Sequence, residues 1–512
     1  MLLVLAAALI GAASAFAFAP VGWWPLMPLA LAALCELVCR SKSLGRSLAV
    51  GWAFGFGQFA VGLNWIATAF TYQAAMPAWL GWIAVVLLSL YLAVYPAIAA
   101  GLAWRFKGKR PIALALALAG AWAVTEWLRG TMFTGFPWNP IGVTLVPTGL
   151  IGLSTTIGTY GLSAFTVLVG AALWLGWRRQ RQPALAVALS LLVSALVLLF
   201  TGSLSMLVGE PAPSGPRNRS IRVLQPNIGQ EDKWREGFAE EAARRLAVLS
   251  MAPGRKQPSL LLWPEAAVTD PLEDMRTDGH QALAQFERSR AAALVGPGEY
   301  LLTGGIAVLS KDGHFITGAA NSIFILGQGG REVGRYDKAH LVPYGEYLPM
   351  RPLLSAIGLS RLAPGDLDFA PGPGPRTVSL PGWGKVGFQL CYEMIFSGEV
   401  VDERDRPDFI FNPSNDAWFG RWGPPQHLAQ ARLRAAEEGI PVVRSTPTGI
   451  SAVIDSNGRI VKSLPWQSAG VIDANLPFAA PPTLFARFGN IIPLLLGFAL
   501  LLSGIVLGRT RR

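Results

Sequence analysis

Charged residues are scarce in this sequence. Asp, Glu, Lys and Arg make up only 15% of the 512 residues, whereas 52% are hydrophobic. An ordinary soluble domain carries about 25% charged residues, so this chain has too little polar side-chain surface to cover itself in water. The composition therefore excludes a typical soluble protein and indicates a membrane protein.

Cysteine and histidine are also rare. Three cysteines cannot form a disulfide framework, and Cys35 and Cys39 lie four residues apart in an apolar stretch, where packing explains them. Cys391 lies outside the apolar stretches. If its domain faces an oxidising compartment, a free thiol is unusual there and indicates a functional role. The four histidines form no Cys/His cluster with metal-ligand spacing, so we expect neither a metal nor another cofactor.

Acidic residues are fewer than basic ones, which gives a formal net charge of +11. Four short clusters beside apolar segments hold 13 of the 43 Lys and Arg residues. The remaining 30 basic residues are nearly balanced in number by the 32 Asp and Glu residues. A balanced remainder argues against a nucleic-acid-binding surface. The clusters are Arg40, Lys42 and Arg46; Arg105, Lys107, Lys109 and Arg110; Arg178, Arg179 and Arg181; and Arg509, Arg511 and Arg512.

Eight apolar segments approach the ~20 residues that cross a bilayer. Lys and Arg favour the cytoplasmic ends of such segments, and the clusters follow the second, fourth, sixth and eighth. Both termini are therefore expected in the cytoplasm, and the long insert between the last two segments outside it. The first segment lacks a basic n-region, so we expect an uncleaved helix rather than a signal peptide. The segments cover about 2–18, 22–39, 48–70, 79–104, 112–128, 156–177, 184–207 and 486–508.

The chain divides into a membrane domain at 1–209, a Pro/Gly/Ser linker at 210–219, a more polar domain at 220–480, and a last membrane helix with a basic tail at 481–512. In the polar domain, short β-like runs alternate with helical patterns, which is typical of a layered α/β fold. Strands are expected at 220–224, 260–263, 300–303, 321–326, 386–390 and 408–411, and helices at 231–250 and 427–438.

Three motifs place reactive side chains next to predicted strands or turns. Cys391 ends one strand, Glu265 closely follows another, and Lys338 lies in a turn-rich segment. A thiol at the rim of a sheet can meet both substrate and backbone amides. Taken singly, a buried inert cysteine or a solvated surface charge explains each motif.

Together, the Glu, Lys and Cys motifs resemble the nitrilase superfamily over about 220–475. The Cys-Tyr-Glu sequence, the long Lys-to-Glu motif and the eight membrane segments resemble one branch of it, the membrane-embedded apolipoprotein N-acyltransferases, over essentially the whole chain. The resemblance implies an αββα sandwich. It also implies Glu265 as general base, Lys338 as the cation that stabilises the oxyanion, and Cys391 as nucleophile.

The resemblance further implies two half-reactions. A phospholipid, in our expectation phosphatidylethanolamine, acylates Cys391, and the N-terminal amine of a diacylglyceryl-cysteine apolipoprotein then takes the acyl chain from the thioester. A thiol of ordinary pKa, about 8.5, is only slightly ionised near neutral pH, so this chemistry needs a base. The implied location is the bacterial inner membrane with the catalytic domain on the periplasmic side. We expect a monomer and no nucleic-acid partner.

Four further residues are secondary candidates. Glu346 and Glu393 either support Lys338 and the base or cap loops, and Tyr392 packs either beside the thioester or in the core. Trp234 resembles a lipid-contacting residue of the family, with an interfacial anchor as the plain alternative.

Two segments are also ambiguous. Residues 135–142 combine turn formers with aromatics, as in an interfacial loop or an ordinary connection. Residues 412–418 shape a pocket wall or form a simple turn.

Two other classes are alternatives to an acyltransferase. A membrane-tethered amidase of nitrilase type would use the same triad with water, but one helix would suffice as its tether. A transporter with an external domain predicts charged or broken helices near the bilayer midplane and paired repeats, and neither is seen in the sequence.

Overall fold

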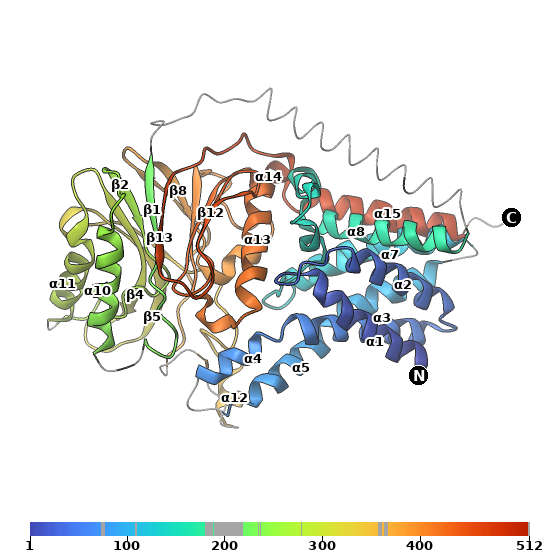
Figure 1. Ribbon diagram of the computed structural model, residues 1–512. Coiled ribbons are helices and arrows are strands. Elements are labelled where there is room, and N and C mark those ends of the chain that lie inside the picture. The colour runs from blue at the N-terminus through green and yellow to red at the C-terminus, as the bar shows by residue number, and fades with distance from the viewer. Residues whose placement is uncertain are drawn as a thin grey trace.

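The computed structural model describes residues 1–72, 77–107, 110–179, 188, 219–233, 235, 237–277, 279–356, 361–362 and 367–509. A helical domain forms one end of the molecule and a two-sheet domain the other (Figure 1). The expected segment at 184–207 lies outside the described residues, apart from the single residue 188.

The helical domain contains the apolar segments that the sequence predicts within the described residues. Four helical stretches there are long and apolar enough to cross a membrane, namely Leu80–Phe106, Pro111–Thr131, Gly149–Trp177 and Ile491–Arg509. The helices are α1 (Leu2–Ser14), α2 (Leu26–Arg40), α3 (Leu44–Gly62), α4 (Ile66–Ala69), α5 (Leu80–Leu92), α6 (Val94–Phe106), α7 (Pro111–Thr131), α8 (Ser154–Trp177), α14 (Leu484–Phe488) and α15 (Ile491–Arg509). Short 3-10 turns are η1 (Ala15–Ala17), η2 (Phe70–Tyr72), η3 (Ile141–Leu145) and η4 (Gly149–Leu153).

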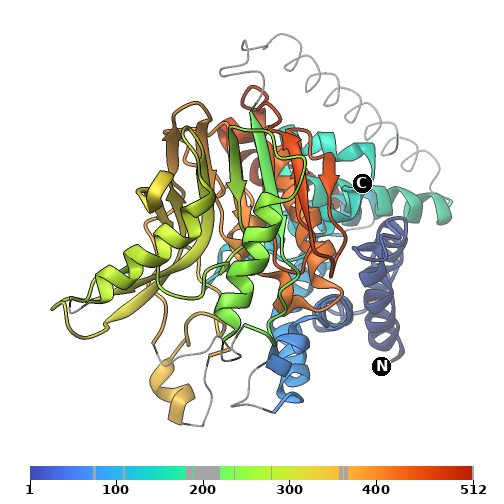
Figure 2. The same cartoon turned by 60° about the vertical axis from the view of Figure 1, so that its left-hand side comes forward.

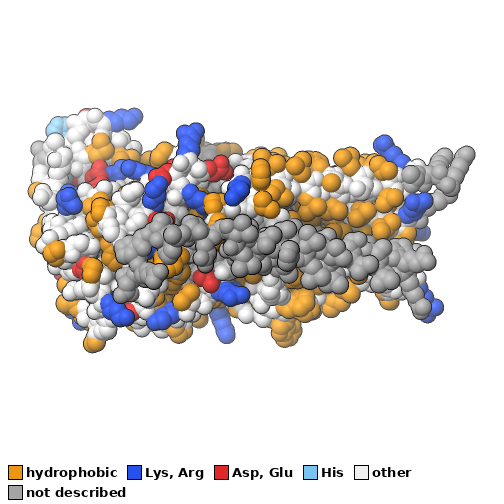
Figure 3. Space-filling model, turned by 90° about the horizontal axis from the view of Figure 1, so that it is seen from above, with side chains coloured by type: hydrophobic (Ala, Val, Ile, Leu, Met, Phe, Trp, Pro, Cys, Tyr) orange, Lys and Arg blue, Asp and Glu red, His pale blue; other side chains and the backbone are white. Residues whose placement is uncertain are grey.

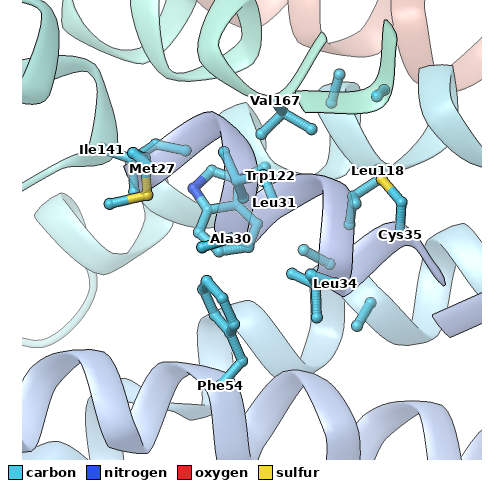
Figure 4. Close-up of a cluster of buried hydrophobic side chains, with 14 of the residues drawn as sticks. Met27, Ala30, Leu31, Leu34, Cys35, Phe54, Leu118, Trp122, Ile141 and Val167 are labelled. Atoms are coloured by element: carbon cyan, nitrogen blue, oxygen red, sulfur yellow. The ribbon is translucent and has the colours of Figure 1, made fainter. Parts of the chain in front are cut away.

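Small residues allow these helices to pack closely. A Cβ atom on Gly57 of α3 would lie 2.1 Å from the carbonyl oxygen of Ala8 on α1, so only glycine permits this approach. Close backbone contact is typical of helices that associate by van der Waals packing in a membrane. Figure 4 shows the core of the domain, where Leu31 of α2, Phe54 of α3, Trp122 of α7 and Val167 of α8 converge.

Described residues of the first three basic clusters lie at the end of the helical domain that points away from the sheets. Lys107 Nζ donates to the carbonyl oxygen of Cys39 at 3.1 Å, and Arg178 lies 3.5 Å from Glu36, so the ends of α2, α6 and α8 meet. Figure 3 shows apolar side chains over the helical half of the molecule and Lys and Arg side chains at its far end.

The second domain contains two facing β-sheets. One has seven strands in the order β13-β1-β2-β4-β5-β6, with β3 paired to β4, and the other has six in the order β12-β11-β10-β9-β8-β7. Strands β1, β2 and β4 are parallel to one another, as are β8, β9 and β10. The strands are β1 (Ser220–Gln225), β2 (Ser259–Leu262), β3 (Glu273–Asp274), β4 (Tyr300–Leu309), β5 (Gly318–Leu326), β6 (Glu332–Asp337), β7 (Thr377–Leu380), β8 (Gly384–Phe388), β9 (Phe409–Pro413), β10 (Val442–Ser445), β11 (Ala452–Ile454), β12 (Ile460–Ser463) and β13 (Gly470–Asn475).

Helices cover the outer face of each sheet. Helices α10 (Phe238–Met251) and α11 (His280–Ala291) lie on the first sheet, and α13 (Gly423–Glu438) lies between the second sheet and the helical domain (Figures 1 and 2). Residues such as Val223, Leu262 and Phe388 fill the space between the sheets. The αββα sandwich implied by the family resemblance is therefore confirmed. Further short elements are η5 (Ala292–Leu294), η6 (Gln328–Gly330), α12 (Arg351–Ala356), η7 (Cys391–Ile395) and η8 (Asp416–Phe419).

All six expected strands are present, but the expected helix boundaries are partly wrong. The helix predicted from residue 231 begins only at Phe238, because Gly237 takes a left-handed conformation with φ 75° that interrupts helical geometry. The helix predicted from residue 427 begins earlier, at Gly423, since Pro424 fits the first turn of a helix without needing a hydrogen-bonded N–H.

Buried contacts join the two domains. Thr159 of α8 donates through its backbone and side chain to Glu437 of α13, at 2.5 and 2.6 Å. Trp138 Nε1 donates to Gln426 of α13 at 2.8 Å. The segment at 135–142 is thus part of the contact between the two domains.

Candidate active site

The thiol of Cys391 lies at a sharp turn. Three residues after β8, Cys391 begins η7 with φ 51°, a left-handed conformation that costs a non-glycine residue about 1–3 kcal/mol. The side chain is only 5% exposed. Such strain persists where the surroundings hold a residue in place, and it fixes the thiol at the edge of the sheet.

The carboxylate of Glu265 lies beyond the carboxyl end of β2. Its backbone approaches β4 so closely that a Cβ on Gly304 would lie 2.7 Å from the Cα of Glu265. Asn321 Nδ2 donates to Glu265 Oε1 at 2.9 Å. Glu265 Oε2 is buried and has no hydrogen-bond partner within the described part of the chain. This oxygen is free to accept a proton.

Lys338 directly follows β6 and is 1% exposed. Its Nζ lies 2.9 Å from both carboxylate oxygens of Glu346. Asn321 Nδ2 also donates to Glu346 Oε1 at 2.9 Å. One amide therefore joins Glu265 to the Lys338–Glu346 pair. The first sheet brings these residues together because β2 and β6 run in the same direction and end at the same edge.

Glu393 connects the Lys338 turn with the Cys391 turn. Its Oε1 accepts hydrogen bonds from the backbone N–H groups of Ala339 and His340 at 2.7 and 3.0 Å and from the Tyr336 hydroxyl at 2.8 Å. Its Oε2 accepts from the backbone N–H of Leu390 at 2.6 Å. The carboxylate thus holds together two turns that belong to different sheets.

A second polar network, absent from the sequence-based candidates, lies beneath Cys391. His427 Nε2 is 3.0 Å from the carbonyl oxygen of Cys391, and because a carbonyl only accepts, this nitrogen carries the proton. Burial and then Arg444 lower the pKa of His427, against the raising effect of Asp416, and Nδ1 lies 3.0 Å from both Asp416 Oδ1 and Arg444 Nη2. Arg444 is paired with Asp416 at 2.6 Å. Residues 412–418, expected as a wall or a turn, therefore support the nucleophile.

The site faces the helical domain. Tyr392 is buried and donates to the carbonyl oxygen of Gly135 at 3.1 Å. His340 Nε2 lies 2.7 Å from the carbonyl oxygen of Thr134. The turns that carry Cys391 and Lys338 therefore both contact the loop after α7. Trp234, the fourth secondary candidate, lies outside the described residues.

Burial controls the electrostatics of the three motif residues. It raises the pKa of the Cys391 thiol well above its ordinary value, Glu265 raises it further, and Lys338 partly offsets the rise. Burial likewise raises the pKa of Glu265 against the lowering effect of Lys338. Burial lowers the pKa of Lys338, but Glu346, Glu265 and Cys391 outweigh it, and the pKa of Lys338 ends above its ordinary value.

These shifts define what the site can do. The resting thiol is neutral and needs a base, and a carboxylate with a raised pKa is a stronger base than usual. The lysine stays charged and offers a cation beside the sulfur. A buried thiol, a carboxylate with a free oxygen and an ammonium are suited to acyl transfer through a thioester.

Comparison with known families agrees with this geometry. A family model described as carbon-nitrogen hydrolase matches residues 220–480, and one described as apolipoprotein N-acyltransferase N-terminal domain matches residues 10–172. Fold and site thus define an enzyme of the nitrilase superfamily whose sandwich is joined to a helical domain.

Relatives match nearly the whole chain. The apolipoprotein N-acyltransferase of Rhodopseudomonas palustris is 35% identical over 505 residues, covering 95% of this chain and 91% of its own. Those of Bradyrhizobium diazoefficiens and Caulobacter vibrioides are 36% and 35% identical, covering 96% and 98% of this chain and 93% of each relative. The chain belongs to the apolipoprotein N-acyltransferase family and is an acyltransferase.

A solved carbon-nitrogen hydrolase from Helicobacter pylori G27 is also similar, with 13% identity and a TM-score of 0.35, over 57% of this chain and 95% of its own.

Proposed function

We propose that this enzyme transfers an acyl chain from a phospholipid to the N-terminal amine of the diacylglyceryl-cysteine of a lipoprotein. The observation that carries this proposal is the position of the site. Cys391 and Lys338 lie in turns that contact the helical domain, and Glu265 is joined to Lys338 through Asn321 and Glu346. Extracting an acyl chain into water costs ~0.8 kcal/mol per methylene, and a site beside membrane helices avoids most of that cost.

In the first half-reaction, Glu265 Oε2 takes the proton of Cys391 and the sulfur forms a bond to the ester carbonyl carbon. The electron pair of the carbonyl moves to its oxygen, where Lys338 stabilises the charge. Collapse breaks the ester C–O bond, and Glu265 returns the proton to the departing lysophospholipid oxygen. Cys391 is left as an acyl-thioester.

In the second half-reaction, the amine of the lipoprotein attacks the thioester carbon. Glu265 takes a proton from the attacking amine, the C–S bond breaks, and the proton passes to the Cys391 sulfur. The product is an amide, and the thiol is restored. Phosphatidylethanolamine is the phospholipid that we propose as donor.

Three supporting residues have positions suited to this reaction. Glu346 keeps Lys338 in place through contacts with both of its carboxylate oxygens, and Glu393 sets the distance between the Lys338 and Cys391 turns. Tyr392 anchors the nucleophile turn to the helical domain. The triad belongs to one chain, which is consistent with a monomeric enzyme.

We further propose that eight segments cross the bacterial inner membrane, with the sandwich in the periplasm and both termini in the cytoplasm. Support comes from the described residues of the first three basic clusters, which lie together at the end of the helical domain remote from the site. Positively charged loops favour the cytoplasmic side. Membrane-impermeant maleimide should label a Lys256→Cys variant in spheroplasts, while an Arg110→Cys variant should react only after lysis. The reverse pattern would contradict this orientation.

Intact-mass measurement tests the reaction. Purified enzyme incubated with phosphatidylethanolamine should gain one acyl mass that hydroxylamine removes, and a diacylglyceryl-cysteine peptide should then receive the acyl chain as an amide. Cys391→Ser should form no hydroxylamine-labile adduct, whereas Cys39→Ser, which removes a thiol of the helical domain, should behave as the parent. If the acyl chain passes only to water, the enzyme is a hydrolase and the proposal is wrong.

A further inference from the structure

Lys233 is a second lysine at the site that no sequence motif identified. It lies in the loop after β1, at the same edge of the first sheet as Glu265, because β1 and β2 are parallel neighbours. Gln230 in this loop accepts a hydrogen bond from Asn415 Nδ2 at 3.1 Å. The backbone N–H of Asn415 is in turn hydrogen-bonded to Cys391. The loop therefore bridges the two sheets beside the nucleophile.

The ammonium group of Lys233 is buried without a partner. The residue is 8% exposed, and its Nζ has no hydrogen-bond acceptor within the residues that the structure describes. Two other deeply buried cations are paired with carboxylates, Arg222 with Asp473 and Arg444 with Asp416. An unpaired buried ammonium is unfavourable for stability, so a purely structural role does not account for it.

The contrast with Lys338 indicates what Lys233 does. Both oxygens of Glu346 already lie 2.9 Å from the Nζ of Lys338, so much of its charge is compensated before substrate arrives. Lys233 interacts electrostatically with Glu265 and Cys391, but forms no hydrogen bond with either in the described structure. Its N–H donors are therefore available to an anion that exists only during the reaction.

We propose that Lys233 is a further catalytic residue, whose unpaired ammonium stabilises the negative charge that forms first on the Cys391 sulfur and then on the oxygen of the tetrahedral adduct. Lys233 transfers no proton in this scheme, because Glu265 takes and returns it. The second of these roles rests on the proposed acyl transfer, whereas the first concerns the thiol alone.

The charge state of Lys233 agrees with this role. Burial lowers the pKa of Lys233 to about 8, against the raising effects of Glu265 and Cys391, so the ammonium form predominates at pH 7. The charged groups that act on the Cys391 thiol from the surrounding elements are Glu265 after β2, Lys338 after β6, Asp416 of η8 and Lys233 after β1. Lys338 and Lys233 are the cations among these four, and within the described residues a carboxylate lies at hydrogen-bonding distance from Lys338 but not from Lys233.

A Lys233→Met variant of the full-length enzyme tests the proposal. Met has a similar length and no charge, so the variant no longer buries an unpaired ammonium. Its thermal unfolding temperature should therefore be equal to or higher than that of the parent. The rate of Cys391 acylation by phosphatidylethanolamine should fall by about 10²–10³-fold, as on removal of one preorganised oxyanion donor. A Lys311→Met variant, which changes an exposed lysine, should match the parent in both measurements.

Alkylation of Cys391 by iodoacetamide, followed by peptide mass mapping against pH, separates the two proposals. Below about pH 8, where Lys233 carries its proton, loss of this cation should slow alkylation of the Lys233→Met variant by about tenfold or more, and above that pH the two profiles should converge. An unchanged profile, an unchanged acylation rate, or a lower unfolding temperature would overturn the role of Lys233. If the parent itself forms no acyl-thioester, the proposed acyl transfer is wrong, and the alkylation profile still decides whether Lys233 stabilises the thiolate.

Discussion

Replacement of Glu393 by Gln should uncouple the turns that carry Lys338 and Cys391. The carboxylate accepts four hydrogen bonds, three at Oε1 and one at Oε2 from Leu390 N–H. Gln has one oxygen and one NH₂ group, so at best its oxygen faces the three donors and its NH₂ group faces the N–H of Leu390. That backbone donor then loses its acceptor in a buried site.

The magnitude follows from these contacts. A hydrogen bond to a charged group contributes about 1.5–3 kcal/mol, and a buried donor without an acceptor is comparably costly. The Glu393→Gln variant should therefore lose about 2–3 kcal/mol of unfolding free energy. Because Glu393 sets the distance between the nucleophile and the lysine, displacement of about 1 Å should slow acylation by about 10²-fold.

The assay combines thermal unfolding in detergent with the acylation rate of Cys391, measured by intact mass. Glu403→Gln, on the surface of the same domain, is the matched control and should leave both quantities unchanged. If Glu393→Gln acylates at the rate of the parent, Glu393 does not position the two turns and the reasoning fails.

Three further outcomes are expected. Glu265→Gln should slow thioester formation by about 10²–10⁴-fold in single-turnover acylation, because an amide cannot take the thiol proton; an unchanged rate would exclude Glu265 as the base. Gly304→Ala should lower both stability and acylation, since its Cβ would lie 2.7 Å from the Cα of Glu265, whereas Gly318→Ala has its nearest contact at 3.8 Å and should be neutral. Burial and Arg444 lower the pKa of His427 in the folded protein. Below about pH 6.5 the unfolded chain therefore binds a proton at His427 more readily than the folded protein does, and the free energy of unfolding decreases as the pH falls. His427→Gln should remove up to about 1.4 kcal/mol per pH unit of that slope in denaturant unfolding, and an unchanged slope would contradict a lowered pKa of His427.

The family and the principal reactive residues could be recognised from local sequence. Glu265 and Cys391 stand at the ends of runs rich in β-forming residues, so their motifs were visible without the fold. Lys338 was recognised in a turn-rich segment, and the strand before it, β6, was not predicted. The apolar segments were equally plain, because a bilayer requires about 20 consecutive apolar residues, and this local property needs no partner elsewhere in the chain. The roles of the three reactive residues stay predictions until they are tested.

Other parts of the site depend on contacts between distant segments. Asn321 is one polar residue in a strand, and only the pairing of β4 with β5 brings its amide to Glu265, 56 residues earlier. In the sequence, His427 is an ordinary residue of a predicted helix. Only the packing of α13 brings its ring to the backbone carbonyl of Cys391, 36 residues earlier. Lys233 was assigned to a helix that in fact starts at Phe238.

The sequence by itself therefore determined the apolar segments, the layered domain and the reactive groups, since each has a local pattern of hydropathy or residue type. Only the tertiary structure decided which groups meet. Parallel strands placed Glu265 and Lys233 at one edge of the first sheet, the facing sheet supplied Cys391, and Glu393 joined the two turns. Burial then set their charges, because the pKa of a thiol, carboxylate or ammonium depends on what surrounds it and not on its neighbours in sequence.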